Sequence, residues 1–435
     1  MKLSILTPII LLLGGISTVY AQAPATPAAT SFDVNGIKVI FRQTTKNVVN
    51  VRMYYRGGVT NYKANKAGIE DLTLQSLTDC GTKKYSSAAL KDTADKYEIF
   101  MFGTSSYDYG FVQVNTVSKY LNQAWDLFTE TIMNPAFEDK QVELLKTKQI
   151  SAIKKAQAYP QTRVEQLEMQ NGFSGTPYAI QPAGNELTLQ NLTSADLKDY
   201  YKTLLNKNKV FIVVVGNLTK QEVFEKVLAS FSNMPSAFYA KPDYPSPAWT
   251  DNKLVGERRD LPTNYITAIM NSPAVNSVDN VPFRLGISAL SNTLYYELRT
   301  NMKLAFDPRA STWSYQMPYA QMNLSTDKPQ EAIPAMINIL KNIQAKGVND
   351  EWLTRIKNSF LISTFINDQS AASITNRLGL SEINGGWQYA DDFPQLVYMA
   401  TTDQVARALN TYVVGLRWTY LGNPDAIEGF KIPPY

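Results

Sequence analysis

A proline-rich segment near the middle of this 435-residue chain separates two stretches that each carry their own pattern of strands and helices. Residues 235–252 contain four prolines, and such density suits a connector rather than a helix or a strand. A chain of this length is also too long for one ordinary domain. We therefore expect two domains, at residues 31–234 and 253–435, joined by a linker at residues 235–252.

The two stretches end alike, which suggests that one structural unit is duplicated. In the first, the residues TSAD at 193–196 precede a helix and then a strand that closes on Gly-Asn at 216–217. In the second, TTDQ at 401–404 precede a helix and a strand that closes on Gly-Asn at 422–423. Similar signals at corresponding places are the mark of an internal repeat.

The hydrophobic pattern within both stretches predicts an α+β fold. An Asn-Gly pair between Val34 and Ile37 is a strong signal for a tight hairpin. Alternating apolar residues predict half-buried strands, and apolar residues three or four apart predict helices. Strands are expected at residues 49–55, 111–117, 210–215, 265–270 and 417–421, and helices at residues 68–78, 86–97, 121–133, 137–156, 197–205, 284–299, 329–345 and 350–365.

The N-terminus has the composition of a secretory signal peptide. Lys2 supplies a positive charge, residues 5–16 are mostly apolar, and Ala21 is a small residue suited to cleavage. We expect residues 1–21 to be removed after Ala21 during export to the periplasm. Residues 22–30, rich in Ala, Pro and Thr, should form a flexible leader. No later stretch could span a bilayer, so the mature chain is expected to have no transmembrane segment.

Histidine is absent from the sequence, and this absence excludes several kinds of catalyst. Histidine is the usual proton carrier near neutral pH and the commonest zinc ligand, so triads and histidine zinc sites are excluded. Cys80 is the single cysteine, so we expect a small core residue rather than a disulfide or a cysteine zinc cluster. The net charge is +4 without a clustered basic stripe, which argues against a nucleic-acid partner.

Several segments, taken in order, resemble the insulinase/pitrilysin family of zinc metallopeptidases, which includes the mitochondrial processing peptidases. The resemblance covers nearly all of the chain after the signal peptide. It implies two homologous insulinase-type domains, each a mainly antiparallel sheet with helices packed on it. The segments are FDVNGIKVIFRQ (32–43), YYRGGVTNYKANKAGIEDLTLQSLTDCGTKKYS (54–86), IMNPAFEDKQVELLKTKQI (132–150), the stretch 175–217 and LSNTLYYELRTNMKLAF (290–306).

Active members carry an H-x-x-E-H motif on the helix that follows a glycine matching Gly68. Two histidines four residues apart share one helix face and bind one zinc ion, while the glutamate activates its water. Counted from Gly68, the three places fall at Asp71, Leu74 and Gln75. Counted back from Gly81, they fall at Leu72, Gln75 and Ser76. Neither register offers a histidine or the glutamate, so residues 68–80 are expected to form a degenerate metal helix.

A glutamate on the downstream helix supplies the third zinc ligand in active members. Residues 144–164 contain no acidic residue, so we expect no metal and no cofactor. An alternative is a hard cation held by Glu70, Asp71 and Asp79, because carboxylates bind calcium and magnesium. Glu70 and Asp71 should point to different sides of a helix, and solvated helix charges are therefore the favoured interpretation.

Active members also use an arginine and a tyrosine of the second domain to bind substrate. In two-subunit members, the subunit without zinc supplies them. Arg299 matches the arginine and could pair with a peptide carbonyl or carboxylate. The tyrosine position falls at Phe306, which keeps the ring and lacks the hydroxyl. The alternative for Arg299 is a cap or a salt bridge within its own helix.

One catalytic arrangement without histidine fits the sequence. Ser325 and Lys328 have the spacing of an S-x-x-K serine–lysine dyad, but its companion motifs are missing. A helix cap at Thr326 or Asp327 is the favoured interpretation of this segment.

These observations predict a pseudo-metallopeptidase, not an enzyme by itself. The resemblance implies the non-catalytic subunit of an exported two-subunit insulinase-family peptidase. Such a subunit would contribute peptide-binding chamber surface to an active partner that carries H-x-x-E-H. The alternative is a scaffold protein of a cell-envelope complex that uses the same fold without peptidase activity.

Overall fold

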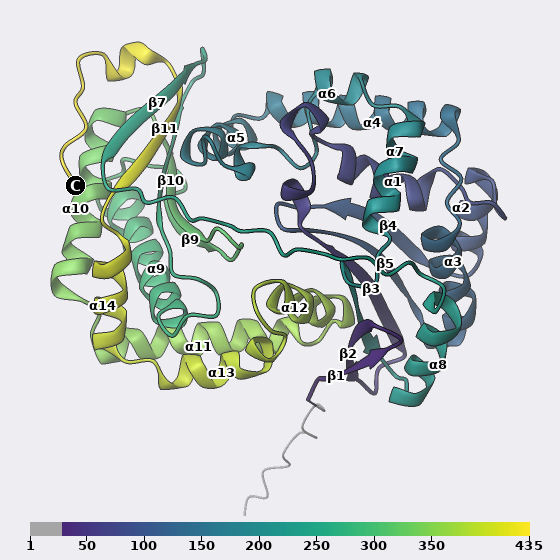
Figure 1. Ribbon diagram of the computed structural model, residues 1–435. Coiled ribbons are helices and arrows are strands. Elements are labelled where there is room, and N and C mark those ends of the chain that lie inside the picture. The colour runs from purple at the N-terminus through teal and green to yellow at the C-terminus, as the bar shows by residue number, and fades with distance from the viewer. Residues whose placement is uncertain (1–27) are drawn as a thin grey trace, which may run out of the picture.

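A computed structural model describes residues 28–435, which form two β-sheets with helices packed against them (Figure 1). The expected α+β fold with two homologous halves is confirmed. The predicted signal peptide, residues 1–21, and most of the predicted leader lie outside the described residues. None of the helices within residues 28–435 is both long and apolar enough to cross a bilayer.

The first half contains the six-stranded sheet and most of the helices that cover it. Its strands are β1 (Thr30–Val34), β2 (Ile37–Gln43), β3 (Val48–Arg56), β4 (Phe100–Ser105), β5 (Tyr109–Val117) and β6 (Val210–Gly216). Its helices are α1 (Ile69–Asp79), α2 (Ser87–Lys96), α3 (Leu121–Met133), α4 (Asp139–Ala158), α5 (Pro160–Gly172), α6 (Glu186–Gln190), α7 (Ser194–Leu204) and α8 (Lys220–Phe231).

The second half contains the five-stranded sheet. Its strands are β7 (Asn252–Arg258), β8 (Asn264–Asn271), β9 (Arg309–Trp313), β10 (Tyr319–Thr326) and β11 (Leu416–Gly422). Its helices are α9 (Asn280–Leu294), α10 (Pro329–Lys346), α11 (Asp350–Asn367), α12 (Ala371–Ile383), α13 (Gln388–Met399) and α14 (Thr402–Tyr412), with a π-helical segment, η5 (Tyr295–Asn301), directly after α9.

The two sheets have the same topology, as a duplication requires. The first has the order β1-β2-β6-β3-β5-β4 and the second has the order β7-β11-β8-β10-β9. In both, the first strand of the shared pattern pairs in parallel with the last strand along the chain, and all other pairs are antiparallel. Strand β1 is an addition, joined to β2 by a turn in which Asn35 and Gly36 have φ angles of 51° and 85°.

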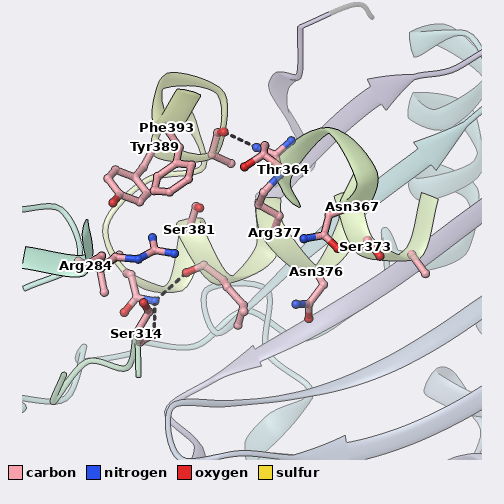
Figure 2. Close-up of a pocket in the computed structure, with 15 residues that line it drawn as sticks. Arg284, Ser314, Thr364, Asn367, Ser373, Asn376, Arg377, Ser381, Tyr389 and Phe393 are labelled. Carbon is pink, nitrogen blue, oxygen red and sulfur yellow. Dashed lines mark hydrogen bonds between the residues drawn. The ribbon is translucent and has the colours of Figure 1, made fainter. Parts of the chain in front are cut away.

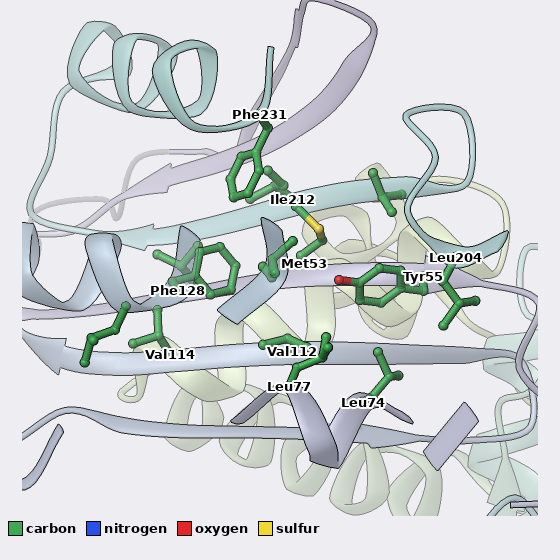
Figure 3. Close-up of a cluster of buried hydrophobic side chains, with 14 of the residues drawn as sticks. Met53, Tyr55, Leu74, Leu77, Val112, Val114, Phe128, Leu204, Ile212 and Phe231 are labelled. Carbon is green, nitrogen blue, oxygen red and sulfur yellow. The ribbon is translucent and has the colours of Figure 1, made fainter. Parts of the chain in front are cut away.

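The core of the first half follows from alternation along the strands. In β3, Met53 and Tyr55 point into a cluster with the helices on one face (Figure 3). Tyr54 belongs to a different cluster, on the other face of the sheet. Both faces of β3 are buried, because helices cover both sides of this sheet. Cys80 lies in the same cluster as Met53, so the prediction of a core cysteine is confirmed.

Two helices cross between the halves, and the sequence pattern did not predict either of them. Helix α5, from the first half, packs on β8 and β11 of the second sheet (Figure 1). Helix α12, from the second half, packs on β3 and β6 of the first sheet. Each half therefore completes the other's sheet face, and neither half buries its own sheet alone.

A glycine lies at each crossing. A Cβ atom on Gly379 of α12 would lie 2.2 Å from Cζ of Tyr54 in β3. A Cβ atom on Gly172 of α5 would lie 2.0 Å from Cδ1 of Ile269 in β8. Because β3 and β8 hold the same place in their sheets, the two crossings correspond to each other. With the neighbouring side chains in their present positions, only a residue without a side chain fits at either crossing.

The predicted linker contributes to the contact between the halves. No helix or strand forms within residues 235–251, and β7 begins at Asn252. Trp249 is buried in an apolar cluster with Phe173 and Tyr319, which belong to different halves. Tyr178 belongs to the same cluster, and its hydroxyl donates to the carboxylate of Asp108, which also accepts from the Gln316 N–H at 2.9 Å. The segment is thus an extended connector with one firmly anchored residue.

Some predicted element bounds were wrong. Strand β1 begins at Thr30, within the segment expected as leader, and Ala29 is already buried. The helix predicted over residues 284–299 begins at Asn280 and changes to π-helical geometry at Tyr295. The helix predicted to end at residue 156 runs to Ala158.

Candidate functional site

Helix α1 is the helix expected to be a degenerate metal helix. Gly68 precedes it with φ 88°, a left-handed conformation that favours glycine. The helix packs against β4, the edge strand of the first sheet, and against α4 and α7. Its residues are therefore mostly buried, and the solvated helix charges favoured from the sequence are not found at Glu70 and Asp71.

Asp71 is a buried carboxylate whose two oxygens accept four hydrogen bonds. One oxygen accepts from the hydroxyl of Thr104 at 2.8 Å and from the N–H of Ser105 at 2.8 Å. The other accepts from Nε2 of Gln75 at 2.7 Å and from Nε2 of Gln149 at 3.0 Å. Burial raises the pKa of Asp71, and these hydrogen bonds partly offset that effect.

The two candidate registers differ in how their side chains are grouped. Asp71 and Gln75 point to the same place, and Gln149 of α4 joins them there. Leu74 lies in the apolar core (Figure 3) and takes no part in this group. In the other register, Leu72 also lies in the core, and the hydroxyl of Ser76 donates to the carbonyl of Leu72 at 2.7 Å.

Gln149 is the residue that sequence reasoning missed. The third metal ligand was expected to be acidic, and residues 144–164 contain no acidic side chain. Gln149 was overlooked because glutamine has the shape of glutamate without its charge. Gln149 lies on the downstream helix that the resemblance expects to carry the third ligand. An amide of glutamate's size on that helix was the signal available in the sequence.

These three side chains do not fit a zinc ion. Zinc prefers imidazole, thiolate and carboxylate ligands, and Asp71 is the only one present. Both glutamines direct an N–H toward Asp71, and the N–H group of an amide cannot coordinate a cation. Among residues 28–435, no three His, Cys, Asp or Glu side chains are grouped to hold a metal. The arrangement is a carboxylate enclosed by hydrogen-bond donors on the helix that was expected to carry the metal ligands.

The alternative cation site at Glu70, Asp71 and Asp79 is not assembled either. Glu70 faces Asn61, Ser105 and Tyr200, which donate to it at 2.8, 3.1 and 2.5 Å. Asp79 pairs with Lys91 at 3.1 Å near the surface. Glu70 and Asp71 share only Ser105, through its hydroxyl and its N–H respectively, and the three carboxylates do not converge on one point.

Glu70 is fully buried, and burial raises its pKa to about 7. The protonated acid is thus favoured in the folded state, and the free energy of unfolding should fall as pH rises from about 4.5 to about 7. The Glu70→Gln variant should remove this loss and be more stable than wild type by about 3 kcal/mol above pH 7. Urea unfolding of both proteins between pH 4 and 8 measures the difference. An equal difference at every pH would contradict the assignment.

Arg299 and Phe306 lie in the second half and are both exposed. Arg299 belongs to the π-helical segment η5, and its guanidinium lies 5.8 Å from the ring centre of Tyr295. It forms no ion pair with a carboxylate among residues 28–435, so the alternative of a salt bridge within its helix is not found. Phe306 has 58% of its side chain exposed, and its N–H donates to the carbonyl of Ser325.

The serine–lysine spacing does not produce a dyad. Ser325 lies at the end of β10, and Lys328 is the exposed N-cap residue of α10. Thr326 and Asp327 are not the cap, although the hydroxyl of Thr326 accepts from the N–H of Lys328 at 2.9 Å. This segment is a strand-to-helix turn.

The fold and the site together define a duplicated α+β protein in which α1 and α4 hold the hydrogen-bonded group of Asp71, Gln75 and Gln149. Residues 38–185 match Insulinase (Peptidase family M16), and residues 191–360 match the Peptidase M16 inactive domain. The chain belongs to the insulinase family, as a non-catalytic member that lacks the H-x-x-E-H residues.

Two sequence relatives are of different kinds. Cytochrome b-c1 complex subunit 1 from Bos taurus is 21% identical over 270 residues, which cover 61% of this chain and 56% of that subunit. The match thus spans little more than half of that relative. Non-peptidase homolog YmxG from Helicobacter pylori is 21% identical over 338 residues, which cover 75% of this chain and 77% of the relative.

Two solved structures share the fold. A protease from Helicobacter pylori superposes with a TM-score of 0.84 at 18% identity, covering 91% of this chain and 99% of that chain. The periplasmic protease PqqL from Escherichia coli superposes with a TM-score of 0.77 at 16% identity, covering 96% of this chain and 49% of that chain. At these identities the similarity concerns the fold alone.

Proposed function

We propose that this protein is the non-catalytic subunit of an exported, two-subunit insulinase-family peptidase. Its role is to supply peptide-binding chamber surface to a partner that carries H-x-x-E-H. The observation that carries the proposal is the carboxylate of Asp71, whose oxygens are already engaged by hydrogen bonds from Gln75, Gln149 and two other donors. A chain with this hydrogen-bonded group and no histidine keeps the architecture of a peptidase unit, but a partner would have to supply the catalytic metal site.

The exposed residues of η5 support a peptide-binding role. Arg299 is free to pair with a peptide carbonyl or carboxylate, and such charged hydrogen bonds are strong. Tyr295, Tyr296 and Phe306 expose more than half of their side chains nearby in sequence. Aromatic and arginine side chains are the ones enriched where proteins bind other chains. A π-helical segment is also frequent at functional sites.

The length of PqqL supports a second unit. The structural match covers nearly all of this chain but only about half of PqqL, so PqqL contains a further stretch of similar size. We propose that a separate partner chain takes this place here. PqqL is described as periplasmic, which supports the proposed export. We further propose cleavage after Ala21 and domains at residues 31–234 and 253–435.

A second candidate function is a scaffold in a cell-envelope complex. The relationship to cytochrome b-c1 complex subunit 1 favours it, because that relative is named as a subunit of a larger assembly. In this case no peptidase partner would be present. Arg299 and Phe306 would then be ordinary surface residues.

Purification of the mature protein from its source tests both functions. We expect the isolated chain to contain no stoichiometric zinc and to leave peptides intact. It should co-purify with an H-x-x-E-H peptidase, and mass spectrometry of the bound proteins identifies it. A large envelope assembly without such a peptidase would favour the scaffold.

Within the two-subunit complex, Arg299→Ala should lower kcat/KM for peptide cleavage about tenfold or more, since a hydrogen bond to a charged group is lost. Arg355→Ala is the matched control, because Arg355 is an exposed arginine of the same half, paired only with Glu351 of its own helix. Unchanged kinetics in Arg299→Ala would remove Arg299 from the substrate site.

A further inference from the structure

A cavity of about 510 Å³ lies where α12 meets α9, α11 and the start of α13 (Figure 2). It is separate from α1 and from η5. Arg284 of α9 lies 15 residues before Arg299, which is roughly 22 Å along a helix at 1.5 Å per residue. The cavity volume falls within the range of small-molecule sites, about 300–1,000 Å³.

Arg284 brings an uncompensated positive charge to this cavity. Its guanidinium lies 4.6 Å from the ring centre of Phe393, and its Nε–H is buried without a hydrogen-bond partner in residues 28–435. No carboxylate of the described chain pairs with it, and no aspartate or glutamate lines the cavity. The second arginine of the lining, Arg377, differs because Asp368 binds it with two contacts of 2.7 Å.

Neutral hydrogen-bonding groups accompany Arg284 in the lining. Ser373, Asn376 and Ser381 of α12 are among the lining residues (Figure 2). Asn376 uses its oxygen to accept from Arg52, so its NH₂ group stays available as a donor. The hydroxyls of Ser373 and Ser381 donate to no other group of the described chain. These donors and the guanidinium can satisfy the oxygens of an anion.

Apolar groups form the remaining lining. Val275, Leu380 and Phe393 offer contact surface for a hydrocarbon body. A half-buried arginine without a counter-ion is costly, and a ligand that supplies a carboxylate removes that cost. The planar fork of one guanidinium matches a carboxylate with two parallel hydrogen bonds.

We propose that this cavity is a binding site for a small organic carboxylate, with Arg284 as the anchor of the carboxylate group. The occupant has a short apolar body, of the size of an amino acid to a short peptide. Its source is either a free organic acid or the C-terminal carboxylate of a peptide. The site does not depend on the proposed subunit role.

Calorimetric titration of the mature protein tests the proposal with four probes: isovalerate, N-acetyl-alanyl-leucine, the C-terminal amide of that dipeptide, and inorganic phosphate. We expect a free carboxylate to bind at least tenfold more tightly than the amide and more tightly than phosphate. Tighter binding of the dipeptide acid than of isovalerate would identify a peptide C-terminus as the source. Equal binding of the two acids would identify a free organic acid.

Variants separate the anchor from general effects. Arg284→Met should weaken carboxylate binding at least tenfold, whereas Arg355→Met, at an exposed arginine of α11, should leave it unchanged. Ser373→Phe places a larger side chain in the cavity, leaves Arg284 unchanged in the sequence and should also abolish binding, so the test stands even if Arg284→Met folds poorly. Binding of the amide as tight as the acid, tighter binding of phosphate, or no binding of any probe at millimolar concentration would overturn the proposal.

Discussion

The Gly379→Ala variant is expected to lose about 2–3 kcal/mol of stability, although alanine is the better helix former. A Cβ atom at this position would lie 2.2 Å from Cζ and 2.3 Å from the hydroxyl oxygen of Tyr54. The ring cannot move aside easily, because it stacks on Phe211 at 4.8 Å and its hydroxyl accepts from Arg52 at 2.9 Å. Helix α12 would have to lift from the first sheet.

Gly172→Ala is the matched control for this prediction. Gly172 holds the corresponding place in α5, but its Cβ would meet the end of the flexible side chain of Ile269. A rotation of that side chain can relieve the contact, so the loss should be smaller by about 1 kcal/mol or more. Urea unfolding measures both variants.

A compensating change at Tyr54 adds a test of the contact itself. Tyr54→Leu in the Gly379→Ala background should recover part of the lost stability, giving a positive coupling in a double-mutant cycle. If Gly379→Ala were neutral or stabilising, as helix propensity alone implies, α12 would not be seated on Tyr54 in solution.

Introducing three metal ligands should convert the group of Asp71, Gln75 and Gln149 on α1 and α4 into a zinc site. The variant combines Asp71→His, Gln75→His and Gln149→Glu. The ends of the wild-type side chains already converge, because one oxygen of Asp71 lies within 3.0 Å of both amide nitrogens. Zinc bonds of about 2.0–2.2 Å can replace these hydrogen bonds. We expect one zinc per chain after gel filtration and an affinity at least about a thousandfold above wild type.

Two controls define the geometry. The double variant that keeps Gln149 should bind zinc at least about tenfold more weakly, since a carboxylate ligand is missing. The other register, with Leu72→His, Ser76→His and Gln149→Glu, should bind no zinc, because Leu72 points into the core. The triple variant should still leave peptides intact, because Leu74 cannot activate water. Retention of zinc by the Leu72 variant, or its absence from the triple variant, would refute the assigned positions.

Local signals predicted much of the fold. The hairpin at Val34 and Ile37 formed as the Asn-Gly pair indicated, and α3 has the predicted bounds, Leu121–Met133. Such elements depend on turn chemistry and on one apolar face, which neighbouring residues determine. The helix predicted after Gly68 formed for the same reason, as α1 (Ile69–Asp79).

The crossing helices could not be predicted in this way. Helix α12 contains Gly379 and polar residues such as Asn376 and Ser381 that line a cavity. These residues suit a helix placed between a sheet and a pocket, but they weaken the amphipathic pattern that identifies a surface helix. The position of α12 is decided by hydrogen bonds from Arg52 and Tyr54 of β3 to residues more than three hundred positions later in the chain.

The sequence by itself determined that this chain is a duplicated α+β protein without histidine, and therefore one that cannot bind zinc through the family motif. Only the tertiary structure decided what replaced that site and what else the fold contains. It placed Gln149 against Asp71, exchanged α5 and α12 between the halves and left Arg284 without a counter-ion. Composition and motif spacing can be read from the sequence directly. The partner of a buried polar group, in contrast, depends on which distant segments pack together.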